Sequence, residues 1–182
     1  MRSLIPSLFC AASLVGCATS GPRLEGPLLE LIHDEGKAAE KPLTPGKAFE
    51  MLMYFDPRLP SYRLERVRFR LAQPGHLMIT VYADAGGKPG KAQKELDRRY
   101  GPELVSTADE GKWIVEDMAG LPLSGPFFVG VWSPEKDSDP RLFATSNDSG
   151  AAFQRETEPP DSIVKIPRTP VLRVEIATSP TR

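Results

Sequence analysis

The residues from Arg66 to Leu71 alternate between cations and large apolar side chains, with Val67, Phe69 and Leu71 between Arg66, Arg68 and Arg70. Successive side chains of a β-strand point to opposite faces, so this pattern predicts a strand with one apolar and one cationic face. Such a strand must cover its apolar face with another layer of structure. The pattern therefore constrains the chain to a fold built around a half-buried sheet.

A second alternating segment follows a Gln73-Pro74-Gly75 turn and runs from Leu77 to Asp84. We expect the two segments to form a hairpin. Further strands are predicted from apolar runs bounded by turn residues, at 104–107, 112–116, 127–132, 142–145, 162–166 and 171–177. The segment 127–132 is apolar on both faces, which predicts a central strand covered from both sides.

One segment, 91–100, is predicted to be helical. Ala92, Leu96 and Tyr100 recur every four residues, and Gly101 and Pro102 would end the helix. Elsewhere, 15 glycines and 19 prolines interrupt the chain without forming a repeat. Short strands between tight turns predict an all-β, jelly-roll-like antiparallel β-sandwich with at most one short helix.

The order of landmarks is similar to that of a jelly-roll accessory domain of bacterial secreted and surface proteins. In that pattern, "V-Y-x-D-x-G-G-x-P-G" (81–90 here) is followed by a strand carrying Trp, here Trp113, then by "G-x-F-x-V-G-V" (125–131) and a last strand at 171–176. The resemblance covers residues 48–178 and implies a fold without a catalytic signature. The predicted helix at 91–100 departs from its simplest form.

The N-terminus predicts a secretion signal. One cation, Arg2, precedes an apolar run of about a dozen residues, and at 1.5 Å per residue such a run reaches roughly 18 Å. The hydrocarbon core of a bilayer is ~30 Å thick, so a targeting peptide fits better than a spanning helix.

The run ends in Leu14-Val15-Gly16-Cys17, which resembles the lipobox of bacterial lipoproteins. The resemblance implies a diacylglyceryl thioether on Cys17, cleavage before it and later N-acylation. Ala18 is not Asp, which in enteric bacteria implies export to the outer membrane. The alternative is an ordinary signal peptide cut near 18–20. We therefore expect a signal peptide at 1–16, a lipidated N-terminus and flexible tether at 17–45, and a β-sandwich domain at 46–180.

Cleavage before Cys17 would remove Cys10 as well as Arg2. The mature chain would then carry 22 basic and 24 acidic side chains, and its one cysteine would be consumed by lipid. A near-neutral surface without runs of like charge lacks the electrostatic footprint of nucleic-acid binding. Because no free cysteine would remain, thiol chemistry and cysteine metal sites are excluded as well.

The sequence nominates no catalytic group. His33 lies in the expected tether and His76 in an expected exposed turn, and neither belongs to a catalytic motif. Glu116 and Asp117 are adjacent in an expected strand, which would send them to opposite faces. The glycines of 84–90 fit a tight turn better than a phosphate-binding loop. We therefore expect a protein that is not an enzyme.

Two ligand sites are conceivable. Acidic and amide side chains in loops could hold a structural calcium ion, if the loops meet, although solvated loops explain the same residues without any ion and are the favoured interpretation. These side chains are Asp84, Asp137, Asp139, Asn147 and Asp148. Trp113, Trp132 and Tyr82 could stack on sugars or anchor a partner, beside the cationic row of Arg66, Arg68 and Arg70. The alternative for both tryptophans is core packing.

The sequence thus predicts a lipid-anchored lipoprotein of the outer membrane that acts as a non-enzymatic structural or interaction module. Its partners would be the membrane and an envelope protein or glycan. A carbohydrate-binding module is the alternative. No cofactor other than calcium is expected.

Overall fold

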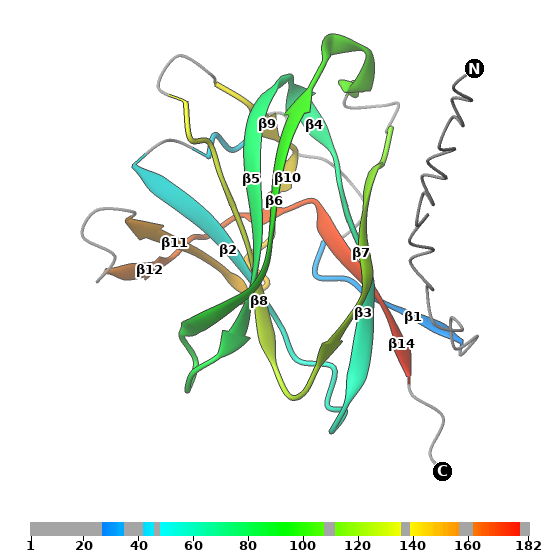
Figure 1. The fold of residues 1–182 in the computed structure, drawn as a ribbon. Coiled ribbons are helices and arrows are strands. Elements are labelled where there is room, and N and C mark those ends of the chain that lie inside the picture. The colour runs from blue at the N-terminus through cyan, green and yellow to red at the C-terminus, as the bar shows by residue number, and fades with distance from the viewer. Residues whose placement is uncertain are drawn as a thin grey trace, which may run out of the picture.

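The computed structural model describes residues 27–34, 42–45, 48–107, 112–135, 139–156 and 162–178. Two antiparallel sheets pack face to face (Figure 1). The larger has six strands in the order β12 (Ile163–Lys165), β11 (Ala152–Glu156), β2 (Phe49–Phe55), β8 (Phe127–Trp132), β5 (Gly75–Asp84) and β6 (Pro89–Tyr100). The smaller has four, in the order β1 (Leu28–Leu31), β14 (Leu172–Thr178), β3 (Tyr62–Phe69) and β7 (Ile114–Leu123).

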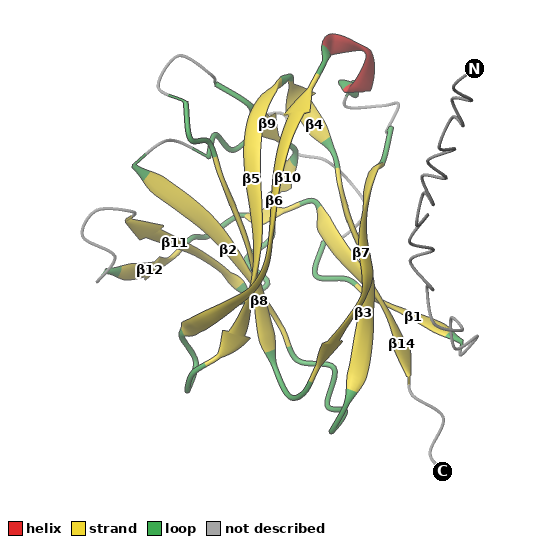
Figure 2. Cartoon of the chain, in the orientation of Figure 1, coloured by secondary structure: helices red, strands yellow, loops and turns green. Residues whose placement is uncertain are grey.

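Two short ladders complete the fold, and the described residues include one 3₁₀ turn, Pro102–Leu104, and otherwise strands and loops (Figure 2). The ladders join β4 (Leu71–Gln73) to β9 (Arg141–Leu142), and β10 (Ala144–Thr145) to β13 (Thr169–Pro170). The all-β sandwich predicted from the sequence is therefore confirmed. In the part of the chain that is described, no helix has the length and apolarity needed to cross a membrane.

The core lies between the two sheets and takes alternate residues of each strand. Val67 and Phe69 of β3 face Val129 and Val131 of β8 across it, and all four are at most 1% exposed. Phe127 lies in the same layer, with its ring 5.4 Å from Phe55. Burying side chains of this size stabilises a fold by roughly 1.5–3 kcal/mol each, so the alternation seen in the sequence carries much of the folding free energy.

The prediction of a central strand at 127–132 is also confirmed. β8 pairs with β2 on one side and with β5 on the other, and its first five residues are buried. β2 itself, with the sequence FEMLMYF, was not predicted, and neither was β11. β1 falls in the segment expected to be the tether, where it pairs with β14 as an edge strand.

The predicted helix at 91–100 is wrong, because these residues form β6, which pairs with β5 throughout. A spacing of four is also a multiple of two, so Leu96 and Tyr100 lie on one face of a strand. Both are buried, while Ala92 at the start of the series is exposed. The charged residues between them occupy the exposed sites of an edge strand, where charge discourages pairing with other chains.

The predicted hairpin of 66–71 with 77–84 is wrong as well. β3 pairs with β14 and β7 in the smaller sheet, whereas β5 belongs to the larger one, and the chain crosses between the sheets through β4. The hairpin that does form is β5–β6, and its turn contains Gly86 and Gly87 with φ of 73° and 83°. Both values lie in the region that glycine tolerates best, so 84–90 is a turn as predicted.

Several predicted strands have shifted ends. The segment 112–116 is the start of β7, and 142–145 is divided between β9 and β10. The segment 104–107 makes only a single bridge, from Val105 to Leu71. The last two predictions correspond to β12 and β14 within one or two residues.

One side of the sandwich is closed by contacts between β6 and β7. The Lys94 Nζ atom donates to the Met118 carbonyl at 2.8 Å, and the Tyr100 hydroxyl donates to Glu116 Oε1 at 2.9 Å. Arg98 pairs with the other oxygen of Glu116 at 3.1 Å. Glu116 is therefore a structural bridge between the sheets, and its neighbour Asp117 points to the exposed face, as the strand alternation predicts.

Candidate functional site

Tyr82 and Trp132 lie on the same outer face of the six-stranded sheet. Val81, Val129 and Val131 point into the core, so the residues between them along β5 and β8 point away from it. In the ladder between β5 and β8, Tyr82 of β5 pairs with Phe128 of β8, and Trp132 is the last residue of β8. Both side chains are half-buried, which places Trp132 outside the core.

The centre of this face holds a buried ionic cluster of Glu50, Tyr82 and Arg155, which we call the Glu50 trio. The Tyr82 hydroxyl donates to Glu50 Oε1 at 2.9 Å, and Arg155 Nε donates to Glu50 Oε2 at 3.0 Å. A second guanidinium nitrogen of Arg155 pairs with the same oxygen. The guanidinium also lies 4.8 Å from the centre of the Tyr82 ring, within cation–π range.

Gly130 of β8 makes room for the Glu50 trio. A Cβ atom at this position would collide with Glu50 Oε1 and lie 2.9 Å from Tyr82 Cε2. The Glu50 side chain is only 2% exposed even though it lies on the outer face of the sheet. The glycine therefore lets a carboxylate lie against the backbone beneath a tyrosine ring.

Burial raises the pKa of Glu50 above its ordinary value, while the charge of Arg155 and the hydrogen bonds from Tyr82 and Arg155 lower it. Burial, followed by the neighbouring Glu50 charge, raises the pKa of Tyr82 to about 12. The phenol therefore keeps its proton at neutral pH and acts as a donor to the carboxylate. Neither Glu50 nor Arg155 was among the site residues predicted from the sequence.

Aromatic rings border the trio on one side. The rings of Tyr54 and Phe128 lie 5.0 Å apart, and those of Phe128 and Phe153 lie 6.2 Å apart. These distances are typical of packed aromatic pairs. Phe128 itself is 1% exposed, so the partly exposed aromatic rings beside the trio on this face are those of Tyr54 and Phe153.

Trp113 lies on the other side of the molecule. Its ring is half-buried on the outer face of the four-stranded sheet, with the guanidinium carbons of Arg68 and Arg173 at 5.0 and 4.6 Å from the ring centre. The three aromatic residues nominated from the sequence therefore form two surfaces. The core-packing alternative fails for both tryptophans.

The arginine row is neutralised to a large extent. Arg66 pairs with Glu175 at 2.9 Å, and Arg68 pairs with Glu30 at 3.0 Å and with Glu175 at 3.1 Å. Arg70 is buried, donates to the Thr107 carbonyl at 2.8 Å and lies over Phe143. Two of the three arginines of the expected cationic edge are thus neutralised by ion pairs, and the third is buried.

Two of the predicted calcium ligands, Asp84 and Asp139, lie far apart. Gln73 of β4 pairs with Arg141, which places neighbouring Asp139 near the start of β5, whereas Asp84 is the last residue of that strand. Ten residues at about 3.3 Å each separate these two ends of the sheet by roughly 30 Å. Within the described ranges, no three His, Cys, Asp or Glu side chains form a group that could hold a metal ion.

The nominated side chains have local partners instead. Asp84 and Asp148 accept hydrogen bonds from the backbone of Gly87 and Gly150, each at 2.9 Å. Asp139 pairs with Arg141 at 2.8 Å, and the Asn147 side chain accepts from the Thr145 hydroxyl. Asp137 and Cys17 lie outside the described residues.

The expectation of an exposed His76 is wrong. This residue is the second of β5 and is 8% exposed, with Nε2 2.5 Å from Asp97 Oδ1 and Nδ1 3.0 Å from Glu135 Oε1. The carboxylates themselves are 67% and 37% exposed. Through these two carboxylates His76 is connected to β6 and to the residues that follow β8.

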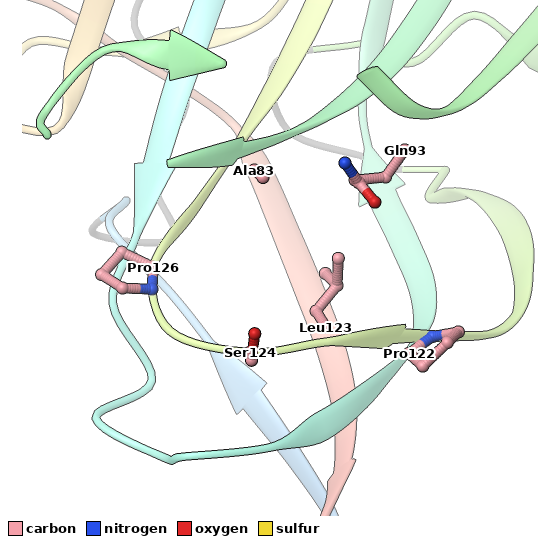
Figure 3. A pocket seen from close by; sticks show the side chains of 6 residues that line it. All are labelled: Ala83, Gln93, Pro122, Leu123, Ser124 and Pro126. Carbon is pink, nitrogen blue, oxygen red and sulfur yellow. The ribbon is translucent and has the colours of Figure 1, made fainter. Parts of the chain in front are cut away.

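His33 is half-buried in a hollow of ≈ 330 Å³ beside β1, with its ring 5.0 Å from that of Phe55. Burial lowers its pKa. A second hollow, of ≈ 280 Å³, lies where β5 and β6 approach the β7–β8 turn (Figure 3). Its walls are formed by Ala83, Gln93, Pro122, Leu123, Ser124 and Pro126, none of which ionises, so the second hollow offers no acid–base chemistry.

No family model matches the chain, and no curated protein matches it in sequence. The fold is similar to part of the chain in the crystal structure of the cysteine protease and lectin-like domains of Cwp84, a surface layer associated protein of Clostridium difficile. The TM-score is 0.52 with 13% identity, and the match covers 73% of this chain and 32% of that chain. At this identity, the likeness shows the fold alone.

Proposed function

We propose that this protein is a lipid-anchored, non-enzymatic interaction module of the bacterial cell envelope. The observation that carries the proposal is the Leu14-Val15-Gly16-Cys17 sequence at the end of a short apolar run, ahead of a β-sandwich. A thioether-linked diacylglyceryl group and an N-acyl chain together give stable attachment, since each buried methylene contributes about 0.8 kcal/mol. The structural likeness to a surface layer associated protein supports a role at the envelope.

The anchor can be tested on the N-terminal peptide of the chain purified from bacterial membranes. Mass spectrometry is expected to find a peptide that begins at Cys17 and carries the mass of a diacylglyceryl group. A mature chain that begins after residues 18–20, with no lipid mass, would show instead that an ordinary signal peptidase processes it.

A carbohydrate ligand is the second candidate, favoured by the shared face of Tyr82 and Trp132. Sugars present C–H faces that stack on aromatic rings and hydroxyls that accept hydrogen bonds from guanidinium groups. The Glu50 trio holds the Arg155 guanidinium beside the Tyr82 ring, while its carboxylate stays buried and orients both side chains. The similar solved chain includes a lectin-like domain. We place the carbohydrate surface on the outer face of the six-stranded sheet and leave Trp113 out of it.

Glycan-array binding should therefore separate the two faces. Tyr82→Ala and Trp132→Ala are each expected to weaken binding at least tenfold, because a central aromatic anchor is worth about 1.4 kcal/mol or more. Trp113→Ala should change it less than twofold. Tyr82→Phe keeps the ring and should keep most of the binding, and the unfolding midpoint of each variant checks that a loss of binding does not reflect unfolding. Equal losses in all three alanine variants, or none, would reject this surface.

A further inference from the structure

The N-terminal edge of the four-stranded sheet is apolar and exposed. β1 is its end strand and pairs with β14 alone among the described strands, leaving one row of backbone groups open. Leu28, Leu29 and Ile32 are 51%, 44% and 45% exposed. We call these three side chains, with the open side of β1, the β1 edge.

The β1 edge is a fixed part of the domain. Glu30 within the strand pairs with Arg68 at 3.0 Å, and Asp34 just after it forms a two-point pair with Arg173 at 2.7 and 2.9 Å. The Asp34 side chain is fully buried. Since both carboxylates are neutralised by arginines of β3 and β14, the apolar side chains are held in place without uncompensated negative charge among them.

The distance along the chain from Cys17 to β1 is short. Ten residues, 18–27, lie between Cys17 and Leu28. Fully extended, these links reach at most about 40 Å, and a flexible chain of this length has a root-mean-square span of roughly 18 Å. A lipid on Cys17 would thus keep the β1 edge within a few residues' reach of the bilayer surface.

We infer that the β1 edge rests in the interfacial region of the bilayer that carries the lipid anchor. This inference depends on the proposed lipidation of Cys17. Leu28, Leu29 and Ile32 enter the boundary between headgroups and acyl chains, while water and headgroups bond to the open backbone groups of β1. The domain is then held in one orientation on the membrane.

A second copy of the chain fits the β1 edge less well. β1 has four residues, and its two exposed leucines are adjacent and point to opposite faces. Pairing two such strands would bury far less than the roughly 1,000 Å² expected of a specific protein interface. A bilayer surface, by contrast, can receive both faces of a short edge at once.

The test uses the lipidated chain in vesicles of phosphatidylethanolamine and phosphatidylglycerol. A fluorophore is attached at Leu29→Cys, or, as a matched control, at Val164→Cys on β12, the edge strand of the other sheet, where the side chain is 61% exposed. Nitroxide-labelled lipids are expected to quench the fluorophore at residue 29 at least threefold more than that at residue 164. Aqueous iodide should show the reverse order.

Equal quenching by lipid at both sites, or stronger quenching at residue 164, would overturn the inference. So would a fluorophore at residue 29 that is shielded from lipid and iodide alike and transfers energy to another labelled copy, since that result identifies a dimer. Flotation of the vesicles beforehand separates the two proposals. A chain that does not float has lost its anchor, which refutes the proposed function and this inference with it.

Discussion

Replacing Arg155 with methionine should lower the free energy of unfolding at pH 7 by about 3 kcal/mol, because it leaves a carboxylate buried without its cation. The Glu50 side chain is 2% exposed, and it forms an ion pair with Arg155 and accepts hydrogen bonds from it. Tyr82 alone would remain as its donor. Chemical denaturation followed by circular dichroism measures the loss.

The loss should shrink as the pH falls. Burial raises the pKa of Glu50, and the substitution removes the influence of Arg155 that lowers it, so the pKa rises further. A folded state with the higher pKa binds a proton where the unfolded chain does not, so its stability increases as the pH falls through that pKa. The gain is complete below the ordinary pKa of 4.5. Adding Glu50→Gln should abolish this pH dependence.

Arg141→Met is the matched control. Arg141 also pairs with a carboxylate, that of Asp139 at 2.8 Å, but the two side chains are 46% and 48% exposed. Exposed pairs typically contribute 0–1 kcal/mol. If the two methionine variants lose equal stability, the Glu50 trio is not the buried cluster described above.

The alternation of side chains predicted strands well but their partners badly. Arg66 to Phe69 and Leu77 to Asp84 are both strands, yet they lie in different sheets, because the alternation fixes which face is buried and says nothing about the neighbour. The spacing of Leu96 and Tyr100 fits a helix and a strand equally. Only pairing with β5 decides between them.

The candidate site shows the same limit. Tyr82 and Trp132 were nominated because they are aromatic, and Trp113 was nominated for the same reason. Which face of the sandwich each residue occupies depends on the order of the strands in the sheets. The sequence does contain an indication of Glu50, because it is the one charged residue in the apolar run FEMLMYF. A carboxylate inside a buried strand needs a partner, although the sequence does not indicate that Arg155 supplies it.

His76 illustrates how local context can mislead. The preceding Pro74 and Gly75 predict a turn, but only Pro74 separates β4 from β5, and the strand that begins at Gly75 buries the imidazole beside Asp97 and Glu135. The acids nominated for calcium show a related effect of topology. Asp84 and Asp139 lie near opposite ends of β5, which the sequence alone does not indicate.

Replacing Cys17 with alanine should have the largest effect on location. If Cys17 is lipidated as proposed, the substitution removes every acyl chain at once. The β1 edge offers only three partly exposed side chains, too little apolar surface to hold a domain on a bilayer without an anchor. The fold should be unaffected, since residue 17 precedes the first strand, β1. Circular dichroism and the unfolding midpoint of the variant should match those of the processed wild-type domain.

Fractionation of cells that express the wild-type chain or Cys17→Ala tests the account most directly. We expect the wild-type chain in the membrane fraction and resistant to high salt, and nearly all of the variant in the soluble fraction with its fold intact. A folded variant that still fractionates with the membrane would contradict the proposal that a lipid on Cys17 anchors the protein.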